Sequence, residues 1–295
     1  MHWTGKVQPV AFTIFGRDIA WYGIIITTAM LIGLITAILL AKKTKLKSDD
    51  LLEAFLIAIP MAIIFARLGY VIVRPYEYYV IEGFDFEDFI NIFAVWDGGL
   101  TIITGAPGGI LGAYLWSRWR KVDFIRLADT IICVMLLSQA LGRWGNFFNQ
   151  EIYGAEITNP KWQFFPAAVY IAREGGFYQA TFFYEMVLNL IGFGIMLYIS
   201  RRLLVRGHGI PLYAITYGTI RFILEFMRDD GDLYEVVNFT QIILGVVVAA
   251  SIAILVYLIM REKKKGNRIW YAKGIPDKLI KPVKYAIYKE GKTDY

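Results

Sequence analysis

Long apolar runs alternate with short charged loops along the whole chain. Seven of these runs approach the length of a membrane-crossing helix, at residues 19–41, 51–73, 99–117, 124–142, 181–200, 209–227 and 237–260. A helix needs about 20 mostly apolar residues to cross the hydrocarbon core of a bilayer. The pattern therefore predicts an all-α polytopic membrane protein with about seven transmembrane helices.

The third run differs from the others in its glycine content. It reads 98-GGLTIITGAPGGILG-112 and carries Pro107 among the glycines. Proline removes one helical hydrogen bond and clashes with the preceding turn. We therefore expect this segment to be broken or partly re-entrant.

The charges in the loops alternate in sign. The loops at 42–50, 118–126 and 201–208 are rich in lysine and arginine, whereas the loops at 74–97 and 228–236 hold six and four acidic residues with one arginine each. Basic loops stay in the cytoplasm. The alternation predicts an extracytoplasmic N-terminus and a cytoplasmic C-terminus.

This topology gives the predicted domain organisation. Residues 1–260 form one membrane domain, in which the long aromatic segment 143–180 is an outer-face head loop. Residues 261–295 form a basic cytoplasmic tail, which we interpret as a solvated tail close to anionic lipid.

Composition excludes several classes of function. The chain is 57% hydrophobic with a formal net charge of +6, and its basic residues lie in short loops, so they indicate membrane topology and not nucleic-acid binding. The single cysteine, Cys133, cannot form an internal disulfide bond. His2 and His208 lie far apart, and no metal, nucleotide or other cofactor motif is present.

Polar residues gather where the fourth run ends, in 142-GRWGNFFNQEIYG-154. Gln139, Arg143 and Asn146 are spaced i, i+4, i+7, so they share one face if the helix continues past residue 142. A guanidinium group suits a phosphate, and the neighbouring glycines let a headgroup approach. An isolated arginine at this position would be interpreted as an interfacial anchor, but the dense cluster favours a binding site.

The sixth run carries a second polar stripe, 217-YGTIRFILEFMRDD-230. Tyr217, Arg221, Glu225 and Arg228 are spaced 0, 4, 8 and 11, which places them on one helix face. A buried arginine is costly unless it is paired, and Glu225 lies one turn from Arg221. The stripe indicates either a functional site or a structural ion pair.

Three further residues are weaker candidates. Tyr22 fits an interfacial aromatic belt as well as a lipid contact, and Arg67 fits a snorkelling side chain equally well. Glu185 opens the fifth run, where a glutamate is often only a favourable partner for the helix dipole.

Together, Arg143, Arg221, Arg228 and a buried glutamate suit an anionic lipid headgroup that enters from the outer leaflet. An enzyme acting on such a lipid needs cations that stabilise the departing phosphate. It also needs a group or relay that activates the incoming nucleophile.

These residues carry a resemblance to a known family. The stretch 142-GRWGNFFNQEIYG-154 resembles the signature of the bacterial prolipoprotein diacylglyceryl transferases, and 21-WYG-23, 66-ARLGY-70, 96-WDGGL-100, 181-TFFYE-185 and 217-YG extend the likeness over roughly residues 10–260. The resemblance implies transfer of the diacylglyceryl group of phosphatidylglycerol to the lipobox cysteine of a prolipoprotein, with release of glycerol 1-phosphate. It implies a multi-pass protein of the bacterial cytoplasmic membrane with an extracytoplasmic active site.

By motif match, the resemblance also implies roles for single residues. The implied catalytic residues are Arg143, Arg221, Glu225 and Tyr217. The implied lipid-binding residues are Arg143, Asn146, Glu151, Gly154, Tyr22, Arg67 and Arg228.

The chain departs from the family pattern in its third run. Pro107 precedes Gly108 and Gly109, where a histidine or tyrosine is usual, so the group that takes the thiol proton stays open. Two other interpretations also stay open: a paralogue that binds phosphatidylglycerol without chemistry, and a lipid transporter. A transporter of the common kind shows two related halves, and no internal repeat is evident.

Overall fold

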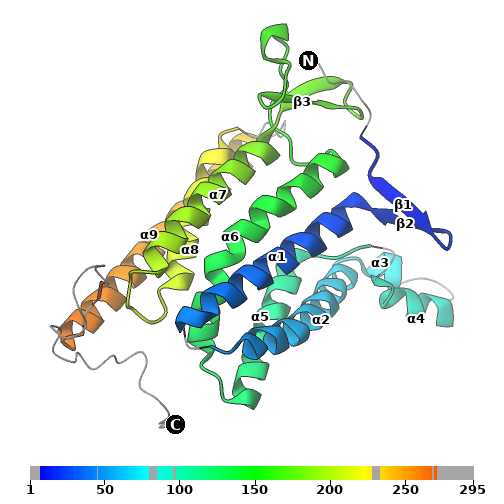
Figure 1. Ribbon diagram of the computed structural model, residues 1–295. Helices are drawn as coiled ribbons and strands as arrows, with labels where there is room; N and C mark the ends of the chain where they lie inside the picture. Colours follow the sequence, from blue (N-terminus) through cyan, green and yellow to red (C-terminus); the bar gives the residue numbers. More distant parts are fainter. Residues whose placement is uncertain are drawn as a thin grey trace. The chain divides into compact units, whose positions relative to one another are not determined.

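Each of the seven predicted apolar runs coincides with a helix in the computed structural model (Figure 1). The structure describes residues 7–44, 46–79, 85–95, 98–227, 233–267 and 269–270. The helices are α1 (Trp21–Thr44), α2 (Ser48–Ile72), α5 (Ile102–Arg120), α6 (Phe124–Asn149), α7 (Thr181–Ser200), α8 (Gly209–Glu225) and α9 (Leu233–Lys264).

Five of these helices contain a segment long and apolar enough to cross a membrane. The segments are Trp21–Ala41, Ser48–Ile72, Phe124–Asn149, Thr181–Ser200 and Thr240–Lys264. The chain is therefore a mostly helical membrane protein. The two remaining helices are α8, which has 17 residues, and the glycine-rich α5, so the total of seven spans stays a prediction.

The chain divides into two compact units, and each is described by itself. The smaller unit comprises residues 40–127 and the larger unit residues 1–39 and 128–295. In the smaller unit α2 packs along α5, and the short helices α3 (Pro75–Tyr78) and α4 (Phe86–Ile92) follow α2.

Glycines allow the close packing of α2 against α5. A Cβ atom added at Gly105 would lie 3.0 Å from Ala66 Cβ, and one at Gly112 would lie 3.0 Å from Met61 Cβ. At Gly108 it would overlap the side chain of Phe65 and lie 2.9 Å from the Met61 carbonyl oxygen. The glycines of the third run therefore serve helix packing, as small residues commonly do in membranes.

The expected break at Pro107 is wrong, because α5 is one continuous helix from Ile102 to Arg120. Pro107 lies in the second turn, where it removes a single helical hydrogen bond near the helix start. Thr104 also ties this end to α2, because its hydroxyl donates to the Phe65 carbonyl at 2.7 Å.

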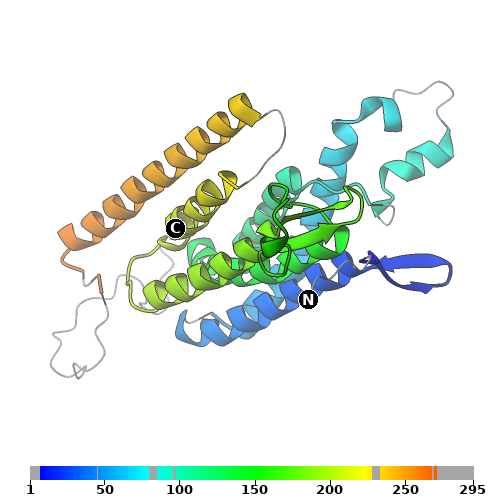
Figure 2. The same cartoon turned by 90° about the horizontal axis from the view of Figure 1, so that it is seen from above.

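In the larger unit, α6 lies between α1 and α7. Ser138 of α6 donates to the Ala29 carbonyl of α1 at 3.0 Å, and a Cβ atom added at Gly192 of α7 would lie 3.1 Å from Leu136 Cδ1 of α6. Helix α8 packs on α7, and α9 lies alongside α8 in both views (Figures 1 and 2). The helices of the larger unit thus contact one another in the order α1, α6, α7, α8 and α9.

The described residues also contain two short hairpins, which the pattern of apolar runs did not predict. Strands β1 (Val10–Ile14) and β2 (Arg17–Ala20) precede α1, and β3 (Ala168–Ile171) pairs with β4 (Gly176–Gln179) before α7. A 3₁₀ turn, Pro160–Trp162, lies ahead of β3.

The head segment begins later than predicted. We expected a loop from residue 143, but α6 continues to Asn149. The reason is packing: Trp144 and Phe147 on the last turns of α6 contact a small core of Val169, Ile171 and Phe182. Of the predicted tail at 261–295, α9 takes in the part to Lys264, and residues 268 and 271–295 lie outside the described residues.

Gly108→Ala should destabilise the smaller unit by about 1–3 kcal/mol, since the added methyl group overlaps Phe65 and the Met61 backbone. Thermal unfolding in detergent would measure the loss. Gly194→Ala is the matched control, because a Cβ atom at this helical glycine meets nothing within 4 Å. An equal effect of both changes would contradict the packing role of Gly108.

Candidate active site

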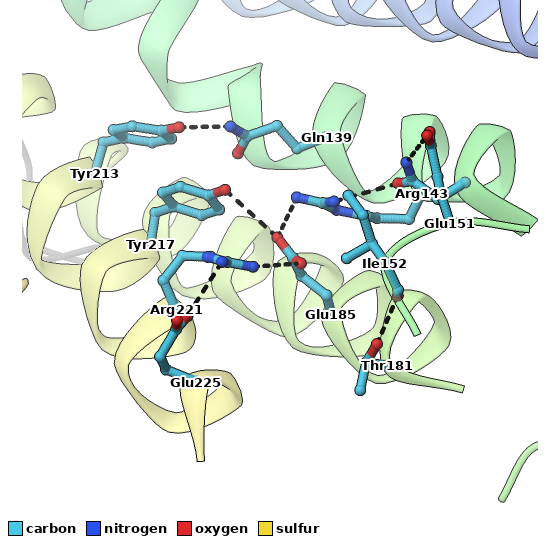
Figure 3. A network of polar contacts seen from close by, with 11 residues as sticks. Gln139, Arg143, Glu151, Ile152, Thr181, Glu185, Tyr213, Tyr217, Arg221 and Glu225 are labelled. Atoms are coloured by element: carbon cyan, nitrogen blue, oxygen red, sulfur yellow. Dashed lines mark hydrogen bonds and ion pairs between the residues drawn. The ribbon is translucent and has the colours of Figure 1, made fainter. Parts of the chain in front are cut away.

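The polar residues of α6 share one face, as their spacing predicts. Because the helix continues to Asn149, Gln139, Arg143 and Asn146 lie on successive turns. Figure 3 shows Gln139 and Arg143 on this helix. Arg143 Nη1 donates to Asn146 Oδ1 at 3.2 Å, and Asn146 Nδ2 donates to Glu151 Oε1 at 2.8 Å. The chain Arg143–Asn146–Glu151 holds the guanidinium group in one orientation.

A strained turn presents Glu151 to this chain. Gln150 and Ile152 both have left-handed backbones, with φ of 50° and 55°. Such a conformation is costly for a β-branched residue and persists only where its surroundings enforce it. Here Thr181 donates to the Ile152 carbonyl at 2.7 Å, and the Gln150 side chain pairs with the Tyr170 carbonyl at 3.2 Å and the Ala172 amide at 3.1 Å.

The stripe on α8 also forms as predicted over the described part of that helix. Arg221 Nη2 contacts Glu225 Oε2 at 3.3 Å, one turn along α8. Tyr217 lies one turn before Arg221 and stacks on Tyr213, with ring centroids 5.5 Å apart. Arg228, the fourth predicted member, lies outside the described residues.

Glu185 of α7 joins the two groups, and the sequence argument undervalued it. Its Oε1 accepts from Arg143 Nη2 at 2.5 Å and its Oε2 from Arg221 Nη1 at 3.2 Å. The Tyr217 hydroxyl donates to Oε1 at 3.4 Å (Figure 3). Glu185 is only 1% exposed.

A signal for Glu185 was present in the sequence. It is the single charged residue of the helix Thr181–Ser200. An ionisable side chain inside a membrane helix is by default a functional or paired residue, and this rule outweighs the helix-dipole interpretation. Helices α6, α7 and α8 thus each contribute one member of an Arg–Glu–Arg cluster.

Tyr22 lies beside the end of α6, and Gly154 lies beside the start of α7. The Tyr22 ring fills the space at Gly145, where an added Cβ atom would lie 2.7 Å from the ring, and its hydroxyl lies within electrostatic reach of Glu151 and Arg143. A Cβ atom at Gly154 would lie 2.6 Å from the Met227 carbonyl oxygen and 2.8 Å from Thr181 Cγ2. Gly154 therefore permits close contact between the head, α7 and the end of α8.

Arg67 belongs to the smaller unit, where backbone carbonyl groups of other residues bind its guanidinium group. It is 4% exposed and donates to the carbonyl oxygens of Asn91, Ile92, Gly98 and Gly99 at 2.6–3.3 Å. The pocket beside it also has the acidic side chains Glu77 and Asp88 in its lining. This geometry favours a structural role, since acidic walls do not suit a phosphate; the lipid contact stays a prediction.

The site offers cations, carboxylates and tyrosines. In the part of the chain that the structure describes, no three histidine, cysteine or acidic side chains gather as metal ligands would. Between them, Arg143 and Arg221 can hold one anion, which is the recurrent device for stabilising a phosphate that gains charge.

Comparison with known proteins finds similar chains. A family model described as prolipoprotein diacylglyceryl transferase matches residues 9–259. Three similar proteins are named phosphatidylglycerol–prolipoprotein diacylglyceryl transferase. The one from Listeria monocytogenes serotype 4b is 34% identical over 94% of this chain and 97% of its own. Those from Clostridioides difficile and Streptococcus pneumoniae are 36% and 35% identical over 89% and 88% of this chain, and 99% and 96% of their own.

Glu185→Gln should cost about 3–5 kcal/mol of stability, because two largely buried arginines lose their shared counter-charge. Thermal unfolding in detergent would report it as a large fall in Tm. Glu174→Gln, at an exposed glutamate paired with Arg173, serves as control and should change Tm little. Unchanged Tm in Glu185→Gln would contradict the role of Glu185 as the centre of the cluster.

Proposed function

The chain belongs to the prolipoprotein diacylglyceryl transferase family, and from this premise we propose that it moves the diacylglyceryl group of phosphatidylglycerol to a prolipoprotein cysteine thiol. The acceptor is the lipobox cysteine of an exported prolipoprotein, and glycerol 1-phosphate is released. The enzyme is a transferase of a bacterial cytoplasmic membrane.

One observation carries the assignment of the site. The guanidinium groups of Arg143 and Arg221, from different helices, both reach the single carboxylate of Glu185, at 2.5 and 3.2 Å. Two cations close enough to share one carboxylate are close enough to share one phosphate. Arginine forks also match phosphate geometry better than lysine does.

The reaction moves charge toward these arginines. The thiol sulfur forms a bond to the carbon of the diacylglyceryl unit that is linked to the phosphate. The bond between that carbon and the phosphate oxygen breaks. The electron pair leaves with the phosphate oxygen, so a diester with one negative charge becomes a more highly charged monoester. Arg143 and Arg221 stabilise that added charge, and Tyr217 lies beside them as a hydrogen-bond donor.

Supporting residues keep the arginines in place. Asn146 and Glu151 orient Arg143 from one side, and Glu185 holds it from the other. Glu225 does the same for Arg221. Tyr22, Arg67, Gly154 and Arg228 complete the proposed lipid-binding set by their match to the family motifs.

We propose seven membrane spans, with the N-terminus and the active site on the extracytoplasmic side. The alternating loop charges support this orientation. It places residues 150–180, the head, where an exported prolipoprotein reaches the membrane.

The decisive assay uses purified protein, phosphatidylglycerol and a lipobox peptide, with the peptide mass as readout. A diacylglyceryl adduct on the cysteine together with free glycerol phosphate supports the proposal. Phosphatidylglycerol binding without an adduct would favour a non-catalytic paralogue or a lipid transporter.

Arg143→Ala should lower the rate of transfer by about 10²–10³-fold, the usual effect of losing one donor to a developing anion. Arg173→Ala removes a 73% exposed arginine of the head and should leave transfer unchanged. Both variants should insert and fold, which size-exclusion chromatography in detergent would check. Full activity of Arg143→Ala would refute its role as phosphate ligand.

Topology can be tested with single cysteines in a Cys133→Ala background, which should stay active because Cys133 is buried and no thiol of the enzyme is needed. A cysteine in place of the exposed Phe15 should react with an impermeant maleimide in intact cells. A cysteine in place of the exposed Lys121 should react only after permeabilisation. The opposite labelling pattern would invert the proposed orientation.

A further inference from the structure

Helices α6 and α7 pack in a register that places Gln139 opposite Asn189. Arg143 pairs with Glu185, and Leu136 contacts the position of Gly192. The two helices are antiparallel, so a step forward along α6 matches a step back along α7, and the residue numbers of facing residues add up to the same value. Arg143 with Glu185 and Leu136 with Gly192 share one sum, and Gln139 with Asn189 has that sum too. Helical spacing puts each member on the same face as its neighbours, one turn from Arg143 and Glu185.

Three of the four side-chain polar atoms of this pair have no hydrogen-bond partner within the described residues. Gln139 Oε1 and both Asn189 Oδ1 and Nδ2 are buried and unpaired, and Asn189 is 0% exposed. A buried unpaired amide costs free energy, so in native proteins it usually has a functional explanation. Replacement by an apolar side chain would remove the cost, yet the helix register places two amides here.

Helix α8 contributes two tyrosines next to Gln139. Gln139 Nε2 donates to the Tyr213 hydroxyl at 2.6 Å, and Tyr217, stacked on Tyr213, donates to Glu185 (Figure 3). We call Gln139, Asn189 and Tyr213 the neutral layer. It holds hydrogen-bond donors and acceptors without a formal charge, directly beside the Arg–Glu–Arg cluster.

We propose that the neutral layer binds the uncharged oxygens of the glycerol units that flank the phosphate of the donor lipid. This inference rests on the proposed function. A glycerophospholipid carries neutral oxygens within a few bonds of its anion, which matches a neutral layer beside a cationic pair. Asn189 offers two donors and an acceptor, and Gln139 offers an acceptor to a hydroxyl group.

The same chemistry has two sources in phosphatidylglycerol: the hydroxyl groups of the headgroup and the ester carbonyls of the diacylglyceryl part. Arg143 and Glu185 lie one turn from the layer on the same helix faces. A phosphate that competes with Glu185 for Arg143 and Arg221 opens this cluster, and the adjoining oxygens then reach the amides.

The experiment compares three donors. They are phosphatidylglycerol, phosphatidylethanol, which lacks the headgroup hydroxyls, and a dialkyl ether phosphatidylglycerol, which lacks the ester carbonyls. We would measure kcat/KM for transfer to a lipobox peptide with the wild-type protein, Asn189→Leu and Gln139→Met. Thr216→Val is the matched control, because it removes a hydroxyl bound to a backbone carbonyl in the same helix bundle.

Each amide variant should lose about tenfold in kcat/KM, and only with donors that carry the oxygens it binds. A loss with both glycerol headgroups but not with phosphatidylethanol assigns the layer to the headgroup hydroxyls. A loss with both ester lipids but not with the ether lipid assigns the layer to the carbonyls; this loss is expected for Asn189→Leu alone, because the unpaired Gln139 Oε1 can only accept a hydrogen bond. Equal loss with all three donors, or no loss, overturns the proposal.

Stability separates binding from structural roles. Leucine at 189 removes unpaired buried amide atoms, so Asn189→Leu should unfold at the same or a higher temperature than the wild type. A lower Tm with unchanged donor preference would mark Asn189 as structural and overturn the proposal. If the wild type forms no thioether with phosphatidylglycerol, the proposed function fails; binding of the three lipids, measured by calorimetry in detergent, then tests the layer alone.

Discussion

The shared carboxylate of Glu185 is the constraint on which the rest of the larger unit depends. Two arginines and a glutamate that are mostly removed from water are tolerable in an apolar bundle only if their contacts are held together. The three residues come from α6, α7 and α8, so the cluster fixes the axial register of all three helices. The register in turn sets which other residues of α6 and α7 face each other.

The head segment serves the same cluster from outside the helices. Gln150, Ile152 and Thr181 hold a strained turn so that Glu151 meets Asn146, and Asn146 meets Arg143. Strain of this kind persists where several contacts enforce it, and here they come from β3, from α7 and from the end of α6. Gly154 adds the close approach that brings the head against the Met227 carbonyl oxygen, just after the end of α8. The segment 150–180 is therefore best understood as a scaffold for one guanidinium group.

Sequence reasoning succeeded where local geometry decides and failed where tertiary contacts do. Helical spacing alone put Gln139, Arg143 and Asn146 on one face, and Arg221 beside Glu225. No local pattern reveals that Glu185 of α7 pairs with arginines of two other helices. Nor does one reveal that four backbone carbonyl groups accept hydrogen bonds from Arg67. The expected break at Pro107 was wrong for the same reason. Proline lowers the propensity for a helix, but glycine-mediated packing against α2 outweighs it.

The charges around the proposed site bear on how the acceptor thiol loses its proton. A cationic neighbourhood lowers the pKa of a thiol, so in the proposed reaction Arg143 and Arg221 would favour the thiolate as well as the phosphate. The phosphate also changes during the reaction, because a departing monoester binds a proton far more readily than the diester does. The thiol proton can therefore end on the leaving phosphate, and atoms and charges balance without a separate base. On this argument the proposed reaction needs no basic side chain directly before Gly108, where this chain has Pro107.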